Sequence, residues 1–318
     1  MSESESVRNG SVEEAGTFGR GWRHHPLVMP LKRNPLVVAA VNAWLDFLCR
    51  NVERYIFVAT TGRSGTVSLA RVFEKAVDGA VCLHEPYPIM FSDYPRGQGI
   101  DRERYFREVF ENLKTIYIKR AAAGHRYYVE TNHQFIKNFA VPAIGYFKNK
   151  IRIIHLRRDP VSVASSFLSI DSVPENTQRG HYYMLEPSDS TNIIRIPELS
   201  DNGGEFGHDL YKCLWYWYET EARVADLKKR YPEAGWVTIG TEQLNDRAAL
   251  SAMFERLGIP VTSERLSRSV SIRENLRTEE KKSVMDPDQC DEMNRKLRTR
   301  IEKQYGKTFL FDEINGSA

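Results

Sequence analysis

Short apolar segments with the pattern of buried β-strands alternate along this chain with amphipathic helix patterns, and this alternation restricts the fold more than any other feature. The strand patterns, rich in β-branched and aromatic residues, cover residues 55–60, 81–83, 127–130, 151–156 and 236–239. The helix patterns cover residues 67–73, 102–123, 209–230, 248–257 and 288–305. Strands that alternate with helices form parallel sheets covered on both faces. We therefore expect an α/β fold, a three-layer sandwich with a central parallel sheet flanked by helices.

The chain of 318 residues is long enough to form one large α/β domain with a sizeable core. Its first segment, MSESESVRNGSVEEAG, is polar and lacks the basic-then-apolar pattern of a signal peptide. The longest apolar run, residues 36–49, is interrupted by Asn42 and Asp46 and is shorter than the roughly 20 residues that a membrane-spanning helix needs. We expect a flexible tail over residues 1–30, a single domain over 31–318, an amphipathic or buried helix over 36–49, and a cytoplasmic protein without a membrane partner.

Charge and cysteine content argue against several kinds of site. A net charge of +3 is too small to indicate a nucleic-acid partner. The four cysteines lie far apart and form no CxxC pair, which disfavours a zinc site or a disulfide framework. We expect no nucleic-acid partner and no bound metal, and the residues leave the oligomeric state open.

The first strand pattern runs into a loop of glycine, hydroxyl and guanidinium residues at the start of the first helix, Thr61-Gly62-Arg63-Ser64-Gly65-Thr66-Val67. Backbone N–H groups at a helix start, together with the helix dipole, form an anion site. The glycines let the backbone wrap a tetrahedral group. Arg63 adds a positive charge, and Ser64 and Thr66 supply hydroxyl donors. The loop therefore predicts a site for a phosphate or sulfate group.

This loop differs from the phosphate loop of nucleotide hydrolases and kinases. A Walker A loop ends in Gly-Lys-Ser/Thr, whereas this one ends in Ser64-Gly65-Thr66 and has its cation, Arg63, before the glycine. No other strand pattern ends in an obvious magnesium-binding aspartate. Magnesium–nucleotide chemistry is therefore disfavoured, although a nucleoside-phosphate-dependent, kinase-like enzyme stays an alternative.

The fourth strand pattern leads into a second polar stretch, in which Arg158 is followed by Asp-Pro and, eight positions on, by Ser166. Pro160 suits the first turn of a helix, so we expect Arg158 at the entrance of a helix and Ser166 about two turns along it. Together with Gly62-Arg63-Ser64-Gly65-Thr66, this stretch resembles the two cofactor motifs of the sulfotransferases that use 3′-phosphoadenosine 5′-phosphosulfate (PAPS). The resemblance covers about residues 55–257. It implies a fold of the P-loop type, PAPS as sulfuryl donor, adenosine 3′,5′-bisphosphate as product, and no metal. It also implies that the loop holds the 5′-phosphosulfate while Arg158 and Ser166 bind the 3′-phosphate.

The second strand pattern ends in His84-Glu85-Pro86. The stretch from Arg63 to Pro86 resembles the carbohydrate 6-O-sulfotransferases, in which the glutamate of a Glu-Pro pair after a strand is the presumed base. The resemblance implies that Glu85 takes the acceptor proton, and Arg63 is the candidate for stabilising the departing phosphate. His84 is an alternative base, because histidine titrates near neutrality.

Other residues near the predicted cleft carry less specific signals. Glu130 and His133 follow the third strand pattern, so they are expected to face the same cleft and remain alternatives for the base. Many relatives have lysine at the position of Glu130. The long polar segment 171–208 is typical of a lid or binding element, and Tyr182 and Tyr183 within it are candidates for acceptor contact.

The sequence also contains a group of aromatic residues and a group of basic residues whose roles can be predicted. Aromatic residues at helical spacing, for which we favour packing over acceptor contact, are Tyr211, Trp215, Tyr216, Trp217 and Tyr218. Basic residues that either reach the 3′-phosphate or form a solvated face are Arg273, Arg277, Lys281 and Lys282. The sequence thus predicts a PAPS-dependent sulfotransferase acting on a hydroxyl or amine of a small-molecule or carbohydrate acceptor. A kinase-like enzyme and a non-catalytic nucleotide-binding module are the alternatives, and the motifs do not identify the acceptor.

Overall fold

The structure is a computed structural model that describes residues 35–92, 101–201, 203–270 and 285–306. The chain forms two compact units, Met1–Arg50 and Asn51–Ala318. The described part of the first unit contains helix α2 (Pro35–Leu48), which confirms the helix expected over residues 36–49, and the predicted tail over 1–30 lies outside the described residues. Across the described ranges, no helix is both long enough and apolar enough to cross a bilayer.

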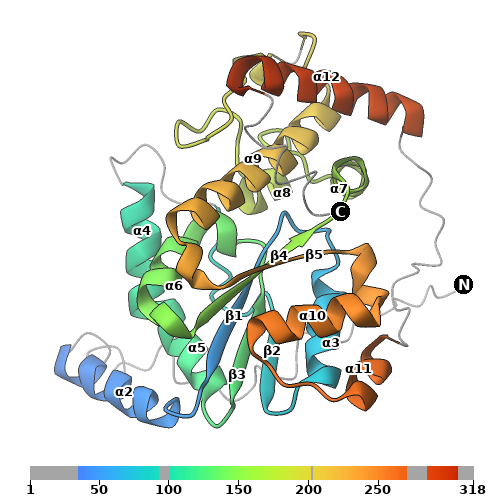
Figure 1. The fold of residues 1–318 in the computed structure, drawn as a ribbon. Coiled ribbons are helices and arrows are strands. Elements are labelled where there is room, and N and C mark those ends of the chain that lie inside the picture. The colour runs from blue at the N-terminus through green and yellow to red at the C-terminus, as the bar shows by residue number, and fades with distance from the viewer. Residues whose placement is uncertain (1–34, 93–100, 202, 271–284, 307–318) are drawn as a thin grey trace, which may run out of the picture. The chain divides into compact units, whose positions relative to one another are not determined.

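Five parallel strands form one sheet in the second unit (Figure 1). They are β1 (Arg54–Ala59), β2 (Ala80–His84), β3 (Tyr127–Thr131), β4 (Ile151–Arg157) and β5 (Trp236–Gly240). Each strand lies where a strand pattern predicts it, and the order across the sheet is β2-β3-β1-β4-β5. Because all carboxyl ends of parallel strands lie at one edge, the segments that follow these strands meet there.

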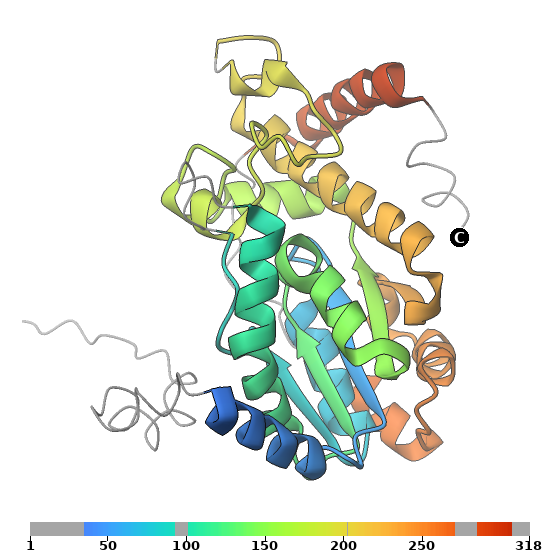
Figure 2. The ribbon, with the colours of Figure 1, turned by 90° about the vertical axis from the view of Figure 1, so that its left-hand side faces the viewer.

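Helices cover both faces of the sheet, which confirms the predicted three-layer α/β fold (Figures 1 and 2). The first face is covered by α3 (Thr66–Ala76), α10 (Arg247–Leu257) and α11 (Ser263–Val270). The second face is covered by α5 (Thr115–Ala122), the π-helical turn η2 (Phe135–Phe139) and α6 (Ala140–Phe147).

The alternation of side chains along β1 separates the two cores. Ile56 and Val58 join an aliphatic cluster with residues of α3 and α10. Phe57 points to the other face, where its ring stacks on Phe135 with ring centroids 5.0 Å apart. The loop after β1 is therefore fixed by a strand that is fully buried on both sides.

The helix predicted over residues 102–123 is interrupted by a π-helical turn. Its first part is α4 (Arg102–Val109), the turn is η1 (Phe110–Lys114), and α5 continues from there. A π-helical turn shifts the register of a helix and re-aims its side chains. Here the turn ends at Lys114, whose buried ammonium reaches the chain just after β2.

A second core lies beyond the carboxyl edge of the sheet, at the top of Figure 1. It is formed largely by α7 (Pro160–Leu168), α9 (Asp209–Arg230) and α12 (Pro287–Tyr305). These confirm the helices predicted over 209–230 and 288–305. Short 3-10 turns join the larger elements: η3 (Lys148–Lys150), η5 (Pro232–Ala234) and η6 (Glu242–Asn245).

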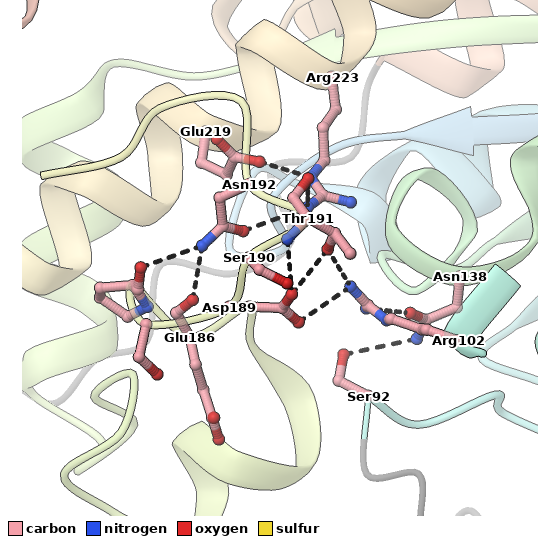
Figure 3. Close-up of polar contacts among 12 residues, drawn as sticks. Ser92, Arg102, Asn138, Glu186, Asp189, Ser190, Thr191, Asn192, Glu219 and Arg223 are labelled. Atoms are coloured by element: carbon pink, nitrogen blue, oxygen red, sulfur yellow. Dashed lines mark hydrogen bonds and ion pairs between the residues drawn. The ribbon is translucent and has the colours of Figure 1, made fainter. Parts of the chain in front are cut away.

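The long polar segment 171–208 is anchored to this second core. It contains the short helix α8 (Gln178–Tyr183) and the 3-10 turn η4 (Pro197–Ser200). The Glu219 carboxylate of α9 accepts hydrogen bonds from two successive backbone N–H groups of the segment, at 3.1 and 2.8 Å. Figure 3 shows Glu219 beside Arg223 and the polar side chains at positions 189–192. The apolar residues that the segment buries in the core are Met184, Leu185, Ile194, Ile196 and Leu199.

Candidate active site

The carboxyl edge of the sheet brings together the segments that the sequence singled out. Thr61 follows β1, Glu85 follows β2, His133 follows β3 and Arg158 follows β4. Because the strand order is β2-β3-β1-β4, Glu85 and His133 lie on one side of the loop after β1, and Arg158 lies on the other side. The loop after β1 therefore lies between the candidate base and the candidate 3′-phosphate site.

The phosphate loop, residues 60–66, contains three residues with a positive φ angle. Gly62 has φ +85° and Gly65 has φ +83°, which glycine adopts without strain, while Arg63 has φ +55°. A Cβ atom on Gly65 would lie 3.0 Å from the Thr241 methyl group, so that a side chain there would press the loop away from β5. Gly65 is thus required by both conformation and space.

The turn leaves a run of backbone donors open at the start of α3. Among the described residues, the N–H groups of Gly62, Ser64, Gly65, Thr66 and Val67 have no hydrogen-bond acceptor. Five open amides at one helix start, joined to the positive end of the helix dipole, attract an anion. This geometry is the one expected of a loop that binds a phosphate or sulfonate group.

Hydrogen bonds from hydroxyl groups stabilise the conformation of the loop. The Ser64 hydroxyl donates to the Gly62 carbonyl at 3.0 Å and lies 3.1 Å from the Thr61 hydroxyl, and both side chains are buried. Tyr216 of α9 donates to the Thr61 carbonyl at 2.9 Å, and Thr241 donates to the Ser64 carbonyl at 2.7 Å. Ser64 therefore stabilises the shape of the loop in this structure, and a hydroxyl donation to a bound anion stays a prediction for Ser64 and Thr66.

The Arg158 stretch contacts the loop directly. Asp159 caps α7 by accepting a hydrogen bond from the Ser162 N–H at 2.7 Å, and the proline that follows begins the helix, as predicted. The Arg63 Nε donates to the Ser166 hydroxyl at 2.9 Å, and Arg158 donates to the Arg63 carbonyl at 2.9 Å. The two predicted motifs, about 100 residues apart in sequence, thus form one continuous polar surface.

A cavity of about 1250 Å³ opens beside this surface. Arg158 lines it at the carboxyl end of β4, together with Gly240 at the end of β5, Glu242 just after β5, and Trp217 of α9. A volume of this order accommodates a nucleotide with room to spare. Among the predicted cofactor residues, Arg158 is the one that lines this cavity within the described part of the chain.

Glu85 and His133 form a close pair on the other side of the loop. Their side chains are joined by a 2.6 Å contact between His133 Nδ1 and Glu85 Oε1, and His133 packs against Gly62 of the loop. Glu85 has φ +47°, an uncommon backbone conformation for a glutamate, and strained residues of this kind cluster at functional sites. The side chain of Glu85 is 26% exposed, so it is accessible to a ligand.

The charges around this pair keep Glu85 ionised and His133 neutral. Burial acts to raise the pKa of Glu85, but the hydrogen bond from His133 and the charges of neighbouring cations lower it to about 2. Burial and the nearby Lys137 ammonium lower the pKa of His133 to about 4. At neutral pH the pair therefore carries one negative charge, on the carboxylate.

Glu130 is fully buried and is surrounded by hydrogen-bonding partners. Its carboxylate pairs with the Lys114 ammonium at 2.7 Å and accepts hydrogen bonds from Tyr128 at 2.6 Å and Asn132 at 2.9 Å. Lys114 also donates to the carbonyls of Pro86 and Pro88, at 3.0 and 2.9 Å. Burial lowers the pKa of Lys114, against the effect of Glu130. Glu130 thus anchors the turn that carries Glu85, and its own oxygens are enclosed.

His84 occupies the end of β2 with one ring nitrogen engaged. Its Nδ1 lies 3.0 Å from the Thr131 carbonyl, which can only accept, so Nδ1 carries the proton. The side chain of His84 is exposed, and its other ring nitrogen stays an alternative base.

Aromatic side chains border the Glu85–His133 pair. The Tyr183 ring lies 5.9 Å from the His133 ring, and Phe91 meets the Tyr183 ring edge-on at 5.2 Å. Tyr182 and Phe91 are 41% and 37% exposed, so both present apolar surface to a ligand. The aromatic residues of α9, in contrast, are almost entirely buried, as favoured from their spacing: Tyr211, Trp215, Tyr216, Trp217 and Tyr218.

Sequence reasoning missed three residues that shape this region. Phe91 lies in a segment without a periodic pattern, and Gln134 and Lys137 lie in or beside the π-helical turn η2, which has no distinct sequence signal. Lys137 is buried and donates to the Tyr183 carbonyl and, at 2.9 Å, to the Tyr216 hydroxyl. Burial lowers the pKa of Lys137 well below its usual value. The predicted basic residues Arg273, Arg277, Lys281 and Lys282 lie outside the described residues.

Comparisons with known proteins give similarities of fold only. No family model and no curated protein matches the sequence. The sulfotransferase domain from the curacin biosynthetic pathway is 15% identical, with 79% of this chain and 98% of that chain covered and a TM-score of 0.41. A mouse sulfotransferase complexed with PAP is 17% identical, over 81% and 88% of the two chains, with a TM-score of 0.43. The sulfotransferase domain from the Synechococcus olefin synthase is 14% identical, over 81% and 94%, with a TM-score of 0.44. Similarities at this level do not assign an activity.

Proposed function

We propose that this protein transfers a sulfuryl group from PAPS to a hydroxyl or amine of a small-molecule or carbohydrate acceptor, with Glu85 as the base. The observation that carries the proposal is the contact between the phosphate loop and α7, in which Arg63 bonds Ser166 while Arg158 bonds the Arg63 carbonyl. A nucleotide with anionic groups at both its 5′ and 3′ positions is able to reach the loop and Arg158 together.

The residues present fit such a nucleotide. The open amides of the loop match a 5′-phosphosulfate, because they supply donors without an added metal charge. The guanidinium of Arg158 borders the large cavity, where a ribose 3′-phosphate would find a charged donor. The Thr60 hydroxyl is buried at the end of β1 without a hydrogen-bond partner in the described residues, which adds a polar group behind the loop.

PAPS would supply an activated sulfuryl group on a phosphate leaving group. On transfer, that phosphate would keep the electron pair of the broken sulfur–oxygen bond and would gain negative charge. The open amides and Arg63 are placed to stabilise that charge, since they are already oriented and need no reorganisation.

Glu85 takes the proton of the acceptor in this proposal. One carboxylate oxygen, Oε1, is occupied by His133, while Oε2 has no hydrogen bond to a described residue. As the acceptor oxygen forms its bond to sulfur, its O–H bond breaks and the proton passes to Oε2 of Glu85. The His133 contact orients the carboxylate for this step. Enclosed within the structure, Glu130 is poorly placed for the same role.

The proposal is tested by an assay of transfer from labelled PAPS to pooled hydroxylated metabolites and sugars. The expected result is a sulfated product that forms in the presence of a chelator. The matched control is Glu85→Gln, which should bind adenosine 3′,5′-bisphosphate but form little product. If no pool is sulfated and the protein instead consumes magnesium-ATP, the proposal is wrong and the kinase-like alternative stands.

A further inference from the structure

The candidate base lies at the end of a chain of hydrogen bonds in which the direction of every donor is fixed. The chain begins at Arg102 of α4 and runs through Asn138, Gln134 and His133 to Glu85. Amide and imidazole groups have interchangeable orientations unless their neighbours decide them. In this hydrogen-bond chain, each amide or imidazole contacts at least one group that can only donate or only accept. The orientation of each side chain is therefore fixed by its neighbours.

Arg102 fixes the first amide. A guanidinium only donates, so the Asn138 atom that lies 2.7 Å from Arg102 is the oxygen Oδ1. Figure 3 shows this contact and the approach of Asn138 to Ser92. The Nδ2 of Asn138 consequently faces the Met90 carbonyl at 2.7 Å and Gln134 Oε1 at 3.0 Å, with the Ser92 hydroxyl at 3.4 Å.

The second amide follows from the first. Gln134 is fully buried, and its Oε1 receives the hydrogen bond of Asn138 and a 3.1 Å contact from the Ser92 hydroxyl. Its Nε2 therefore faces the other way, where it donates to the Tyr183 carbonyl at 3.1 Å. That carbonyl only accepts, which confirms the orientation independently from the opposite side.

The imidazole follows from the second amide. The Nε2 of Gln134 lies 3.0 Å from the Nε2 of His133, and because the amide nitrogen donates, the ring nitrogen accepts. The remaining proton of His133 is then on Nδ1, where it is donated to Glu85 Oε1. Protonation of His133 at Nε2 would place two donors against each other, so the contact opposes an imidazolium.

We propose that Gln134, oriented by Asn138 and Arg102, is a positioning residue that locks His133 in its neutral Nδ1–H tautomer and thereby keeps Glu85 as the unprotonated, oriented acceptor of the substrate proton. The significance for the reaction rests on the proposed function, whereas the tautomer itself does not. The charged and titratable groups that face the pair are His84 at the end of β2 and Lys137 of η2. Both favour a neutral His133, in agreement with the lock.

The tautomer is measured by ¹⁵N NMR on the full chain labelled in its histidine side chains, with His133 assigned by its loss in His133→Gln. The expected spectrum has a protonated Nδ1 and an unprotonated Nε2 for His133, unchanged between pH 8 and pH 5. A protonated Nε2 at pH 7 would overturn the proposal, whatever the protein catalyses.

The lock is broken by Gln134→Glu, which replaces the donor facing His133 by an acceptor. We expect the Nε2 of His133 to become protonated, the activity to gain a titration between pH 5 and 8, and kcat/KM at pH 7 to fall roughly tenfold to a hundredfold. Gln304→Glu is the control, because it makes the same chemical change at an exposed position of α12 and should alter neither signal.

Failure of the inference and failure of the proposed function are distinguishable. The lock is wrong if Gln134→Glu leaves the tautomer of His133 unchanged, or if kcat/KM shifts only through substrate affinity with no new titration. Should this variant fail to fold, the tautomer of the native chain decides the matter. A native Nδ1–H tautomer in a protein that transfers no sulfuryl group would refute the function and leave the lock in place.

Discussion

The two sides of the candidate site, one at β1 and β4 and the other at β2 and β3, consist of different kinds of polar groups. On the side of β1 and β4, the proposed anion-binding groups are backbone amides of a short loop and the side chains of Arg63, Arg158 and Ser166. On the side of β2 and β3, the site is a chain of side-chain hydrogen bonds that runs from Arg102 of α4 through residues 133–138 to Glu85. A site built from backbone amides can be predicted from a short sequence motif. A site built from buried side chains depends on the tertiary structure and cannot be predicted from a motif.

The two sides also predict different consequences of mutation. The first side is proposed to bind the nucleotide, so changes there should alter the affinity for it. At the second side, buried side chains orient the Glu85 carboxylate and keep it ionised, so changes there should alter turnover or stability. The following predictions use this contrast, beginning with the largest expected effect.

Replacing Glu85 by Gln should lower turnover by roughly 10² to 10⁴-fold, because the amide cannot accept the acceptor proton. The affinity for adenosine 3′,5′-bisphosphate should stay the same, since Glu85 lies on the other side of the loop from Arg158. Steady-state kinetics and calorimetry on the same preparation measure both quantities. Unchanged turnover would assign the base to His84 or to another group.

Replacing Glu130 by Gln should lower the free energy of unfolding by about 3–5 kcal/mol, because it leaves the Lys114 ammonium buried without its partner. The control is Glu108→Gln, which removes the exposed ion pair with Arg104 and should have no measurable effect. Urea unfolding compares the two variants. A stability equal to that of the native chain would show that the Glu130–Lys114 pair does not anchor the turn at Glu85.

Acidification should destabilise the protein through His133. Its pKa is lowered on folding from 6.5 to about 4, so between these values the unfolded chain binds a proton that the folded chain excludes. The contribution to the free energy of unfolding therefore falls by roughly 3 kcal/mol as the pH falls from 6.5 to 4. Unfolding measured across this range should show the loss in the native chain and not in His133→Gln. Parallel pH profiles for the two proteins would mean that His133 titrates normally.

Replacing Arg158 by Ala should weaken the binding of adenosine 3′,5′-bisphosphate roughly tenfold to a hundredfold, as expected for the loss of a charged hydrogen bond. Ser166→Ala should have a smaller effect, of about fivefold. Arg107→Ala on α4 is the control and should leave the affinity unchanged. Equal affinities in all three would remove the 3′-phosphate from this part of the site.

The contrast also explains how much was predictable from the sequence. All five strands were predicted, because each is a short apolar run bounded by turn residues. The start of α7 at Pro160 was predicted from the missing N–H of proline and its fixed backbone angle. The proximity of the phosphate loop to Arg158 followed from the parallel sheet, which places both at one edge.

The network around Glu85 was only partly predictable. Glu85 and His133 were recognised as ionisable residues at strand ends, but their 2.6 Å contact depends on how two loops meet in space. The role of Gln134 depends on a donor from Asn138 and an acceptor from Tyr183, and these two residues belong to different elements. The anchoring of Glu130 depends on Lys114, which the π-helical turn aims at the site. No spacing along the chain carries this information.

The most direct test of the account is calorimetric titration with adenosine 3′,5′-bisphosphate and with ATP, each with magnesium and with a chelator. Because the proposed anion site consists of amides and guanidinium groups, the account predicts binding of the bisphosphate with the same affinity in both conditions, and tighter binding than that of ATP. Tight binding of ATP that requires magnesium, with weak binding of the bisphosphate, would contradict it.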